Sequence, residues 1–138
     1  MYEKYVKKAW DEKGYKVPHP YSRTIKHIFA PDRGPVDELT FSFAILPPQG
    51  KTHYHKHDRG ELIYVVTGRG ECEIDGEKYA LEPDVVFWCP TEVMHGVVNT
   101  GDETMKLATV FVPAYRTEEL KGSILEAAQR DCSSETKK

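Results

Sequence analysis

Hydrophobic and polar residues alternate in short segments through the middle of the chain. From residue 23 onward, eight runs of five to eight residues are rich in β-branched and aromatic side chains, which is typical of strands. These runs are Arg23–Phe29, Leu39–Leu46, Glu61–Thr67, Gly70–Ile74, Glu77–Leu81, Val85–Cys89, His95–Asn99 and Met105–Val112. Turn-forming residues separate them, and Asp75-Gly76 is the clearest turn because this pair suits a two-residue hairpin. The pattern predicts an all-β, antiparallel sandwich or barrel.

The N-terminal residues follow a different pattern. Residues 1–10 predict one or two helical turns, because their apolar residues fall near one helical face. The next stretch contains Gly14, Pro18 and Pro20, so it is expected to be irregular. We therefore predict an N-terminal arm over residues 1–22, which is either mobile or packed on a partner subunit.

Residues 117–138 predict a C-terminal helix and tail. Thr117 suits the helix cap, and the two glutamates that follow it favour the first turn. An apolar stripe is expected from Leu120, Ile124 and Ala127 or Ala128. The segment from Cys132 to Lys138 is polar and is expected to fray. The β-barrel domain is then predicted to cover residues 23–116.

Composition and charge narrow the classes of function. The chain has 138 residues, of which 39% are hydrophobic and 30% charged, with a formal net charge of −3. The sequence contains no cluster of excess basic residues, so it does not indicate a nucleic-acid partner. No apolar run approaches the roughly 18 residues that span a bilayer, and the N-terminus lacks the apolar stretch of a signal peptide. We therefore expect a cytoplasmic protein without a membrane partner, in which Cys72, Cys89 and Cys132 are free thiols.

The run from residue 53 to residue 61 is rich in metal-ligating side chains. On an extended chain alternate side chains share a face, so His53, His55 and His57 are expected to point the same way. If Gly60 provides a local adjustment, Glu61 joins them on that face. The run therefore predicts a cluster of imidazoles beside one carboxylate.

The residues after Glu61 indicate where this cluster lies. Ile63 and Val65 continue on the same face, whereas Tyr64 falls on the opposite face. A carboxylate at the wall of an apolar interior is costly unless a partner satisfies it. A metal ion does so, because imidazole and carboxylate both bind divalent transition metals. The alternative is a solvated loop in which the histidines merely lie close together.

Residues 50–99 contain two spaced motifs. The first has two histidines, a glutamate and a glycine in the arrangement His55-x-His57-x3-Glu61-x6-Gly68. The second has the arrangement Pro90-x-Glu92-x2-His95-x3-Asn99. Taken alone, a histidine such as His95 of the second motif is more often a core residue than a metal ligand. Together and in this order, the motifs resemble those of the cupin superfamily, and the chain is similar to its small single-domain members over most of residues 39–113.

The resemblance implies a double-stranded β-helix, or jelly-roll barrel, that binds one divalent metal ion. Carried over residue by residue, it implies four ligands: His55, His57, Glu61 and His95. The resemblance assigns no ligand role to His53. Three roles are open for it: a neighbour that supports the ligands, a base in the pocket, or an exposed residue at the rim. Asn99 is expected to hold a loop rather than contact a substrate.

Three positions depart from the family pattern. The glycine that opens the first motif lies one residue nearer than usual, at Gly50. Pro83 stands where a glycine is usual in the turn before the second motif, and Glu92 replaces a turn glycine. The loop at Glu92 must therefore avoid a positive φ or adopt it with strain. These departures affect the entrance to the site rather than the implied ligand set.

Three imidazoles and one carboxylate would leave about two positions open on an octahedral ion. A small oxygenated substrate could chelate there, and the ion would lower the pKa of a bound hydroxyl and stabilise an enolate. Iron or manganese is expected, with nickel, zinc and cobalt as alternatives. Glu61 is the first candidate to carry a proton, and His53 and Tyr64 are weaker ones. An apolar pocket is expected, with five aromatic candidates for its wall: Phe41, Phe43, Tyr79, Trp88 and Phe111.

Three classes of function remain open at this point. The first is a metal-dependent enzyme that is either dioxygenase-like or an isomerase or lyase working through an enolate. The second is a non-catalytic sensor or carrier of a small acid or sugar, and the third is a barrel whose metal only supports the fold. Open coordination positions favour the enzyme. A homodimer is also expected, because small barrels often cover a sheet face or edge with a second copy.

Overall fold

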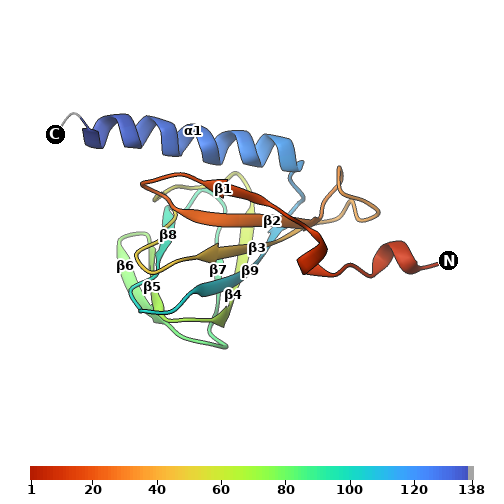
Figure 1. Cartoon of the computed structure of the whole chain (residues 1–138), viewed down its shortest axis with the longest axis horizontal. Helices are drawn as coiled ribbons and strands as arrows, with labels where there is room; N and C mark the ends of the chain where they lie inside the picture. The colour runs from red at the N-terminus through yellow and green to blue at the C-terminus, as the bar shows by residue number, and fades with distance from the viewer. Residues whose placement is uncertain (137–138) are drawn as a thin grey trace.

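The computed structural model describes residues 1–136 and shows two antiparallel sheets with a long helix beside them (Figure 1). The larger sheet has the strand order β1-β2-β3-β9-β4-β7 and the smaller one β6-β5-β8. The strands are β1 (Tyr15–Val17), β2 (Arg23–Phe29), β3 (Thr40–Leu46), β4 (Gly60–Thr67), β5 (Gly70–Ile74), β6 (Glu77–Leu81), β7 (Val86–Cys89), β8 (His95–Val98) and β9 (Met105–Val112). The predicted all-β jelly roll is confirmed, although its strands form two separate sheets rather than one closed barrel.

The N-terminal arm is more ordered than expected. Its first part forms two short 3₁₀ turns, Glu3–Tyr5 and Ala9–Asp11. The stretch predicted to be irregular instead contains β1, which pairs with β2 and buries Val17. Gly14, with φ +74°, precedes this strand, and a Cβ there would lie 2.4 Å from the carbonyl oxygen of Ile25. A strand of three residues is too short to show a hydrophobic period, so the sequence pattern missed it.

Helix α1 (Thr117–Thr136) lies along β1 at the outer side of the larger sheet (Figure 1). Its predicted apolar stripe is confirmed, with four buried residues: Leu120, Ile124, Ala127 and Ala128. Asp32, from the loop before β3, accepts hydrogen bonds from the amide and the hydroxyl of Thr117. The helix runs past Cys132, where fraying was expected, and the last two residues of that predicted tail lie outside the described residues.

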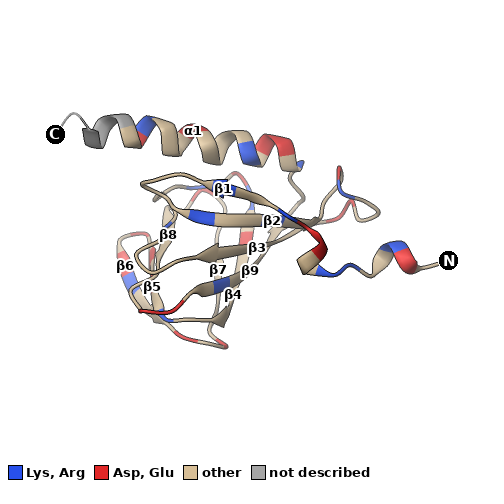
Figure 2. Ribbon diagram, viewed as in Figure 1, with Lys and Arg blue, Asp and Glu red and all other residues tan. Residues whose placement is uncertain are grey.

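Charge is distributed along the elements rather than concentrated in one of them (Figure 2). The first turn of α1 carries Glu118 and Glu119, which suit the positive end of the helix dipole. Within residues 1–136, no helix has the length and apolar character that a membrane crossing requires. Cys72, Cys89 and Cys132 are free thiols.

Two apolar clusters hold these layers together. One lies between the two sheets and contains Leu46, Val65, Met105 and Leu107, each 1% exposed or less. The other joins the larger sheet to α1 and contains Val17, Ile25, Phe111, Leu120 and Ile124. The functional side chains described next lie beside both clusters.

Candidate metal centre

The start of β4 places a carboxylate in the interior. Glu61 is 7% exposed and lies on the same side of the strand as the buried residues Ile63 and Val65, as predicted. The ring of Trp88 packs over Gly60, and a Cβ at that glycine would lie 2.0 Å from a ring carbon. The strand can therefore approach its neighbour β7 only because residue 60 lacks a side chain.

Backbone hydrogen bonds join the two sequence motifs. The amide of His55 donates to the carbonyl of His95 at 2.9 Å, and the amide of His95 donates to the carbonyl of His55 at 2.7 Å. The amide of Glu92 donates to the carbonyl of His57 at 2.7 Å. Glu92 has φ +65°, so this loop adopts the left-handed conformation that a glycine would adopt without strain.

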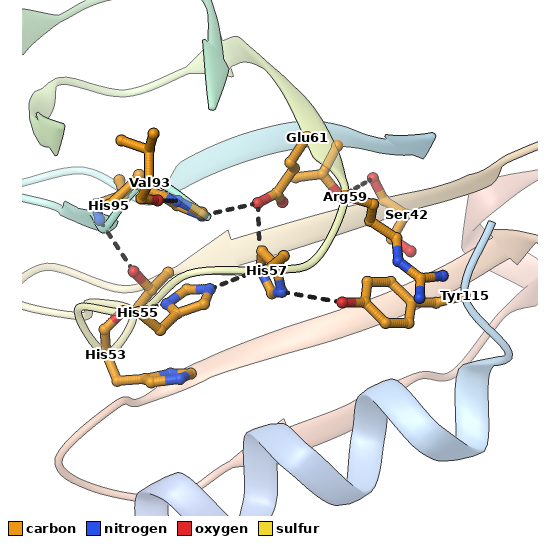
Figure 3. Close-up of polar contacts among 12 residues, drawn as sticks. Ser42, His53, His55, His57, Arg59, Glu61, Val93, His95 and Tyr115 are labelled. Atoms are coloured by element: carbon orange, nitrogen blue, oxygen red, sulfur yellow. Dashed lines mark hydrogen bonds and ion pairs between the residues drawn. The ribbon is translucent and has the colours of Figure 1, made fainter. Parts of the chain in front are cut away.

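Four side chains converge as a result (Figure 3). The candidate ligand atoms of His55, His57, Glu61 and His95 all lie within 4.8 Å of one another. Nε2 of His55 lies 2.8 Å from Nε2 of His57, and Oε1 of Glu61 lies 3.1 Å from Nε2 of His95. Ligand atoms about 2.1 Å from one ion are themselves roughly 3 to 4 Å apart. The cluster therefore fits a metal site.

Backbone partners determine which nitrogen of two imidazoles carries the hydrogen. Nδ1 of His55 contacts the carbonyl oxygen of His53, and Nδ1 of His95 lies 3.0 Å from the carbonyl oxygen of Val93. A carbonyl only accepts, so each Nδ1 is a donor and the Nε2 of the neutral ring carries a lone pair. Nε2 of His95 then faces a carboxylate oxygen of Glu61. Two acceptors at this distance repel each other unless a proton or a metal ion lies between them.

Burial and charge also separate the pKa values of these histidines. Burial lowers the pKa of His55 to about 2 and that of His57 to about 4, and neighbouring histidines act in the same direction. Burial also lowers the pKa of His95, but the hydrogen bond and charge of Glu61 raise it above its ordinary value. His55 and His57 are therefore neutral at neutral pH, as metal ligands must be. The contact between His95 and Glu61 is where positive charge is favoured.

The two weaker proton-carrier candidates are not members of this cluster. His53 is half-buried and stacks on His55, with ring centroids 4.0 Å apart, and its Nδ1 is buried without a hydrogen-bond partner among the described residues. It is therefore a neighbour of the candidate ligands rather than an exposed rim residue. Tyr64 faces outward, is 38% exposed and donates a hydrogen bond to Asp84. The structure does not bring Tyr64 to the cluster.

Tyr115 is a neighbour of the cluster that the sequence pattern missed. Its hydroxyl lies 3.4 Å from Nδ1 of His57 and donates to Asp58 at 3.1 Å (Figure 3). The Arg59 guanidinium lies 3.6 Å from the centre of the Tyr115 ring. Tyr115 therefore orients the His57 ring from the segment that leads into α1. It follows β9 without any motif, so the sequence offers no signal for it.

A cavity of about 60 Å³ adjoins the four side chains. Of the five aromatic candidates, Phe43 and Phe111 line it, whereas Phe41, Tyr79 and Trp88 do not. Its wall also contains residues from β2 and β3 that the sequence analysis did not single out, namely Arg23, His27 and Ser42. In the sequence these three residues are marked only by the alternation of strand faces. Every inward-facing residue shows the same alternation, so it does not single them out.

His27 and Asn99 are buried polar residues with structural partners. His27 Nδ1 lies 2.7 Å from the hydroxyl of Ser42, and Nε2 lies 2.9 Å from the hydroxyl of Tyr15. Burial lowers the pKa of His27 to about 4. Asn99 donates to the carbonyls of Leu46 and Glu103, at 3.0 Å and 2.8 Å. As expected, Asn99 holds a loop.

Comparison with known proteins shows several relatives. A glucose-6-phosphate isomerase from Thermococcus onnurineus is 28% identical over 131 residues, which cover 79% of this chain and 69% of the relative. A 5-nitrosalicylic acid 1,2-dioxygenase from Bradyrhizobium is 29% identical over 86 residues, which cover 57% of this chain and 42% of the relative. In three of the curated relatives the matched region covers only 35% to 62% of the relative's length.

A solved structure shares the fold. A Thermotoga maritima protein, described as a predicted oxalate decarboxylase, superimposes with a TM-score of 0.72 at 18% sequence identity, covering 78% of this chain and 98% of that one. At this identity the likeness shows the fold alone. Residues 42–112, more than half of the chain, match the cupin domain family. The chain therefore belongs to the cupin family.

Proposed function

We propose that this protein is a metal-dependent enzyme that acts on a small oxygenated substrate. One divalent transition metal would be held by His55, His57, Glu61 and His95. Iron or manganese suits this mixture of nitrogen and oxygen ligands, with nickel, zinc and cobalt as alternatives. The reaction would be a dioxygenation, or an isomerisation or lyase reaction through an enolate.

The convergence of the four candidate ligand atoms within 4.8 Å of one another carries this proposal. Nε2 of His95 and Oε1 of Glu61 are 3.1 Å apart, while Nδ1 of His95 is already engaged by a backbone carbonyl. Without a metal, a proton on His95 satisfies this carboxylate, and a bound divalent cation would take the place of that proton. Nε2 of His57 lies 3.7 Å from the same Oε1, so the same cation is within reach of a third ligand.

When bound, a divalent metal supplies a Lewis acid that polarises a chelated oxygen and lowers the pKa of a bound hydroxyl. The residues of the chain orient the site and exclude water. Tyr115 and the carbonyls at residues 53 and 93 orient the imidazoles. Ile63 and Phe111 provide an apolar wall. Glu61 contacts the histidines through Oε1, so its Oε2 is the atom that would accept a proton from the substrate.

The relatives are consistent with both reaction types. One is a dioxygenase and another is an isomerase, and both are similar to this chain over more than half of its length. The cupin fold alone does not choose between them, because one fold supports many reactions. The choice depends on whether molecular oxygen is consumed.

The first experiment is metal analysis of protein purified without chelators or a metal-affinity step. We expect close to one transition-metal ion per chain in the wild type and a sharp loss in His55→Ala and His95→Ala. His53→Ala is the matched control, because that ring stacks on His55 but lies outside the cluster, and it should lose less metal. Full metal content in His95→Ala would remove that residue from the proposed ligand set.

The second experiment separates the reaction types. The loaded protein is offered diketones, catechols and thiols while oxygen consumption is followed, and the same panel is repeated without oxygen. Oxygen uptake with product supports a dioxygenase, and anaerobic turnover supports an isomerase or lyase. Tight binding without product under any metal would favour a sensor or carrier instead. Loss of the fold on metal removal, with no ligand reaching the ion, would favour a purely structural metal.

We further propose that the chain forms a homodimer in the cytoplasm. Four exposed apolar side chains on the outer face of β4 and β7 support this: Leu62, Tyr64, Val86 and Trp88 are 37% to 55% exposed. β7 is also an edge strand, and edges of this kind are often covered by a second copy. Light scattering should give twice the 15.8 kDa chain mass, and a value near 15.8 kDa would contradict the dimer.

A further inference from the structure

Arg23 is a buried charge in the wall of the cavity. It is the first residue of β2, is 6% exposed, and lines the cavity together with the four candidate ligands. Ile25 and His27 follow it on the same face of the strand and also line the cavity. Burial lowers the pKa of Arg23 to about 10, so its guanidinium remains charged at neutral pH.

The described residues give Arg23 backbone partners but no carboxylate at ion-pair distance. Its Nη1 donates to the carbonyl of Tyr21 at 2.9 Å and lies 3.5 Å from that of Lys51. By contrast, four more exposed arginines each pair with an acidic side chain: Arg33, Arg59, Arg69 and Arg130. A buried charge without a carboxylate in direct contact is costly, so the most buried of these arginines has the greatest need of an anionic partner.

The charge of the cavity also favours an anion. Arg23 contributes one positive charge and Glu61 one negative charge to the wall of the cavity. A divalent ion in the proposed centre would therefore leave an excess of about two positive charges next to a low-dielectric wall. An acid that presents a carboxylate and a second oxygen with partial or full negative charge would balance this excess.

We propose that the Arg23 guanidinium binds the carboxylate of a small organic acid in this cavity, while a neighbouring oxygen of the acid reaches the metal. The second contact rests on the metal centre proposed above, and the first does not. The planar fork of donors on arginine matches a carboxylate well. The substrate class is therefore a short 2-oxo or 2-hydroxy carboxylic acid.

The size of the cavity supports a short acid. Its volume is about 60 Å³, and each water-sized group needs roughly 10 to 15 Å³, so a ligand of about four to six non-hydrogen atoms fits. Pyruvate and glycolate are in this range, whereas a sugar phosphate is much larger. Leu120 and Ile124 of α1 line the same cavity, so the helix bounds the space for a ligand on that side.

The test compares pyruvate with pyruvamide, its uncharged analogue, by calorimetric titration of the metal-loaded protein. Wild type should bind the acid about tenfold to a hundredfold more tightly than the amide, as expected for a charge-assisted hydrogen-bonded pair. Arg23→Gln should abolish this preference, and Arg23→Lys should keep part of it. Arg69→Gln is the control for loss of one surface charge, because Arg69 pairs with Glu82 at the surface, and it should leave the preference unchanged.

The outcomes are decisive even if Arg23→Gln does not fold. Equal binding of acid and amide by the wild type overturns the proposal without any variant. An unchanged preference in folded Arg23→Gln also overturns it and leaves Arg23 as a tie between two backbone segments. Tighter binding of inorganic phosphate than of pyruvate would overturn the carboxylate class.

Metal analysis of the same samples separates this proposal from the proposed function. If the wild type holds metal but does not prefer the acid, only the proposed role of Arg23 is contradicted, and the proposed metal centre is not. Wild type that holds no metal but still prefers the acid, with the preference lost in Arg23→Gln, contradicts the metal centre and supports the anion site. Thermal melts of each variant, followed by circular dichroism, establish that the compared proteins are folded.

Discussion

The inward faces of β3, β4 and β9 change character from one end to the other. At one end Leu46 lies opposite Met105, and both are fully buried. Four residues earlier on β3, Ser42 lies opposite Thr109, and these are 3% and 7% exposed. The two ends are almost equally buried, yet one is closed by apolar packing and the other contains polar groups that need partners. Burial alone therefore does not distinguish the part that holds the fold from the part that does chemistry.

The same contrast occurs within β4. Val65 and Ile63 pack in the apolar cluster, and Glu61 on the same face reaches the histidines. A buried apolar side chain stabilises the fold without any other component. A buried carboxylate beside unprotonated nitrogens does so only with a cation or a proton. Substitutions at the two ends should therefore separate stability from metal binding.

The largest stability effect is expected at the apolar end. Leu46→Ala removes a fully buried side chain and should lower the free energy of unfolding by about 2 to 5 kcal/mol. Urea unfolding measures this, and the folded fraction should keep its metal. Ser42→Ala on the same face is the matched change at the polar end and should have a smaller effect on stability. If Ser42→Ala lowers the free energy of unfolding more than Leu46→Ala does, the apolar end is not the more important one for stability.

Gly60→Ala is expected to lower both the stability of the fold and the affinity for metal. The new methyl group would meet the Trp88 ring, so either the ring or the start of β4 must move, at a cost of about 1 to 3 kcal/mol. Because Glu61 is the next residue, metal affinity should fall as well, and parallel metal titration tests this. Gly122→Ala is the control, since nothing lies within 4 Å of a Cβ there. If Gly60→Ala is destabilised but binds metal as tightly as the wild type, the movement caused by the methyl group does not reach Glu61.

The polar end should make the metal-free protein sensitive to acid. Folded His27 has a pKa of about 4, below the 6.5 of an exposed histidine, so between these values the unfolded chain binds a proton that the folded chain does not. Stability from His27 is therefore present above about pH 6.5 and is lost as the pH falls towards 4, with a slope of up to about 1.4 kcal/mol per pH unit. Urea unfolding of wild type and His27→Gln across this range measures the difference. Parallel pH profiles would contradict the assigned pKa.

The smallest effect is expected in the loop that joins the two motifs. Glu92→Gly relieves a left-handed backbone conformation and should raise the free energy of unfolding by less than about 1 kcal/mol, because the greater freedom of glycine in the unfolded chain offsets part of the gain. Thermal melts measure this shift. The metal content should not change, because Glu92 contacts His57 only through its backbone amide. A destabilised variant would show that the ion pair of Glu92 with Lys56 matters more than the strain.

The sequence predicted the strands to within one residue at each end because strand signals are local. Alternation with period two marks which residues face inward, and pairs such as Asp75-Gly76 mark the turns, where both residues indeed have positive φ. The four candidate ligands were anticipated differently, through the resemblance of two spaced motifs to the cupin family, because His95 lies 34 positions from Glu61 and no local signal joins them. Strand β1 could not be anticipated, since its three residues show no period.

Tertiary structure alone decided the surroundings of the site. Arg23 and Tyr115 lie 38 and 54 positions from Glu61 in the chain, and no local pattern distinguishes them from other polar residues. Their roles come from packing: β2 turns Arg23 into the cavity, and the segment before α1 lays Tyr115 against His57. By itself the sequence determined the sheet pattern, because alternation and turn signals depend on neighbours close in the chain. Its two motifs marked the four candidate ligands through their resemblance to the cupin family, and folding brought the second motif to the first. Folding determined the charge and shape of the cavity, because those depend on contacts between distant segments.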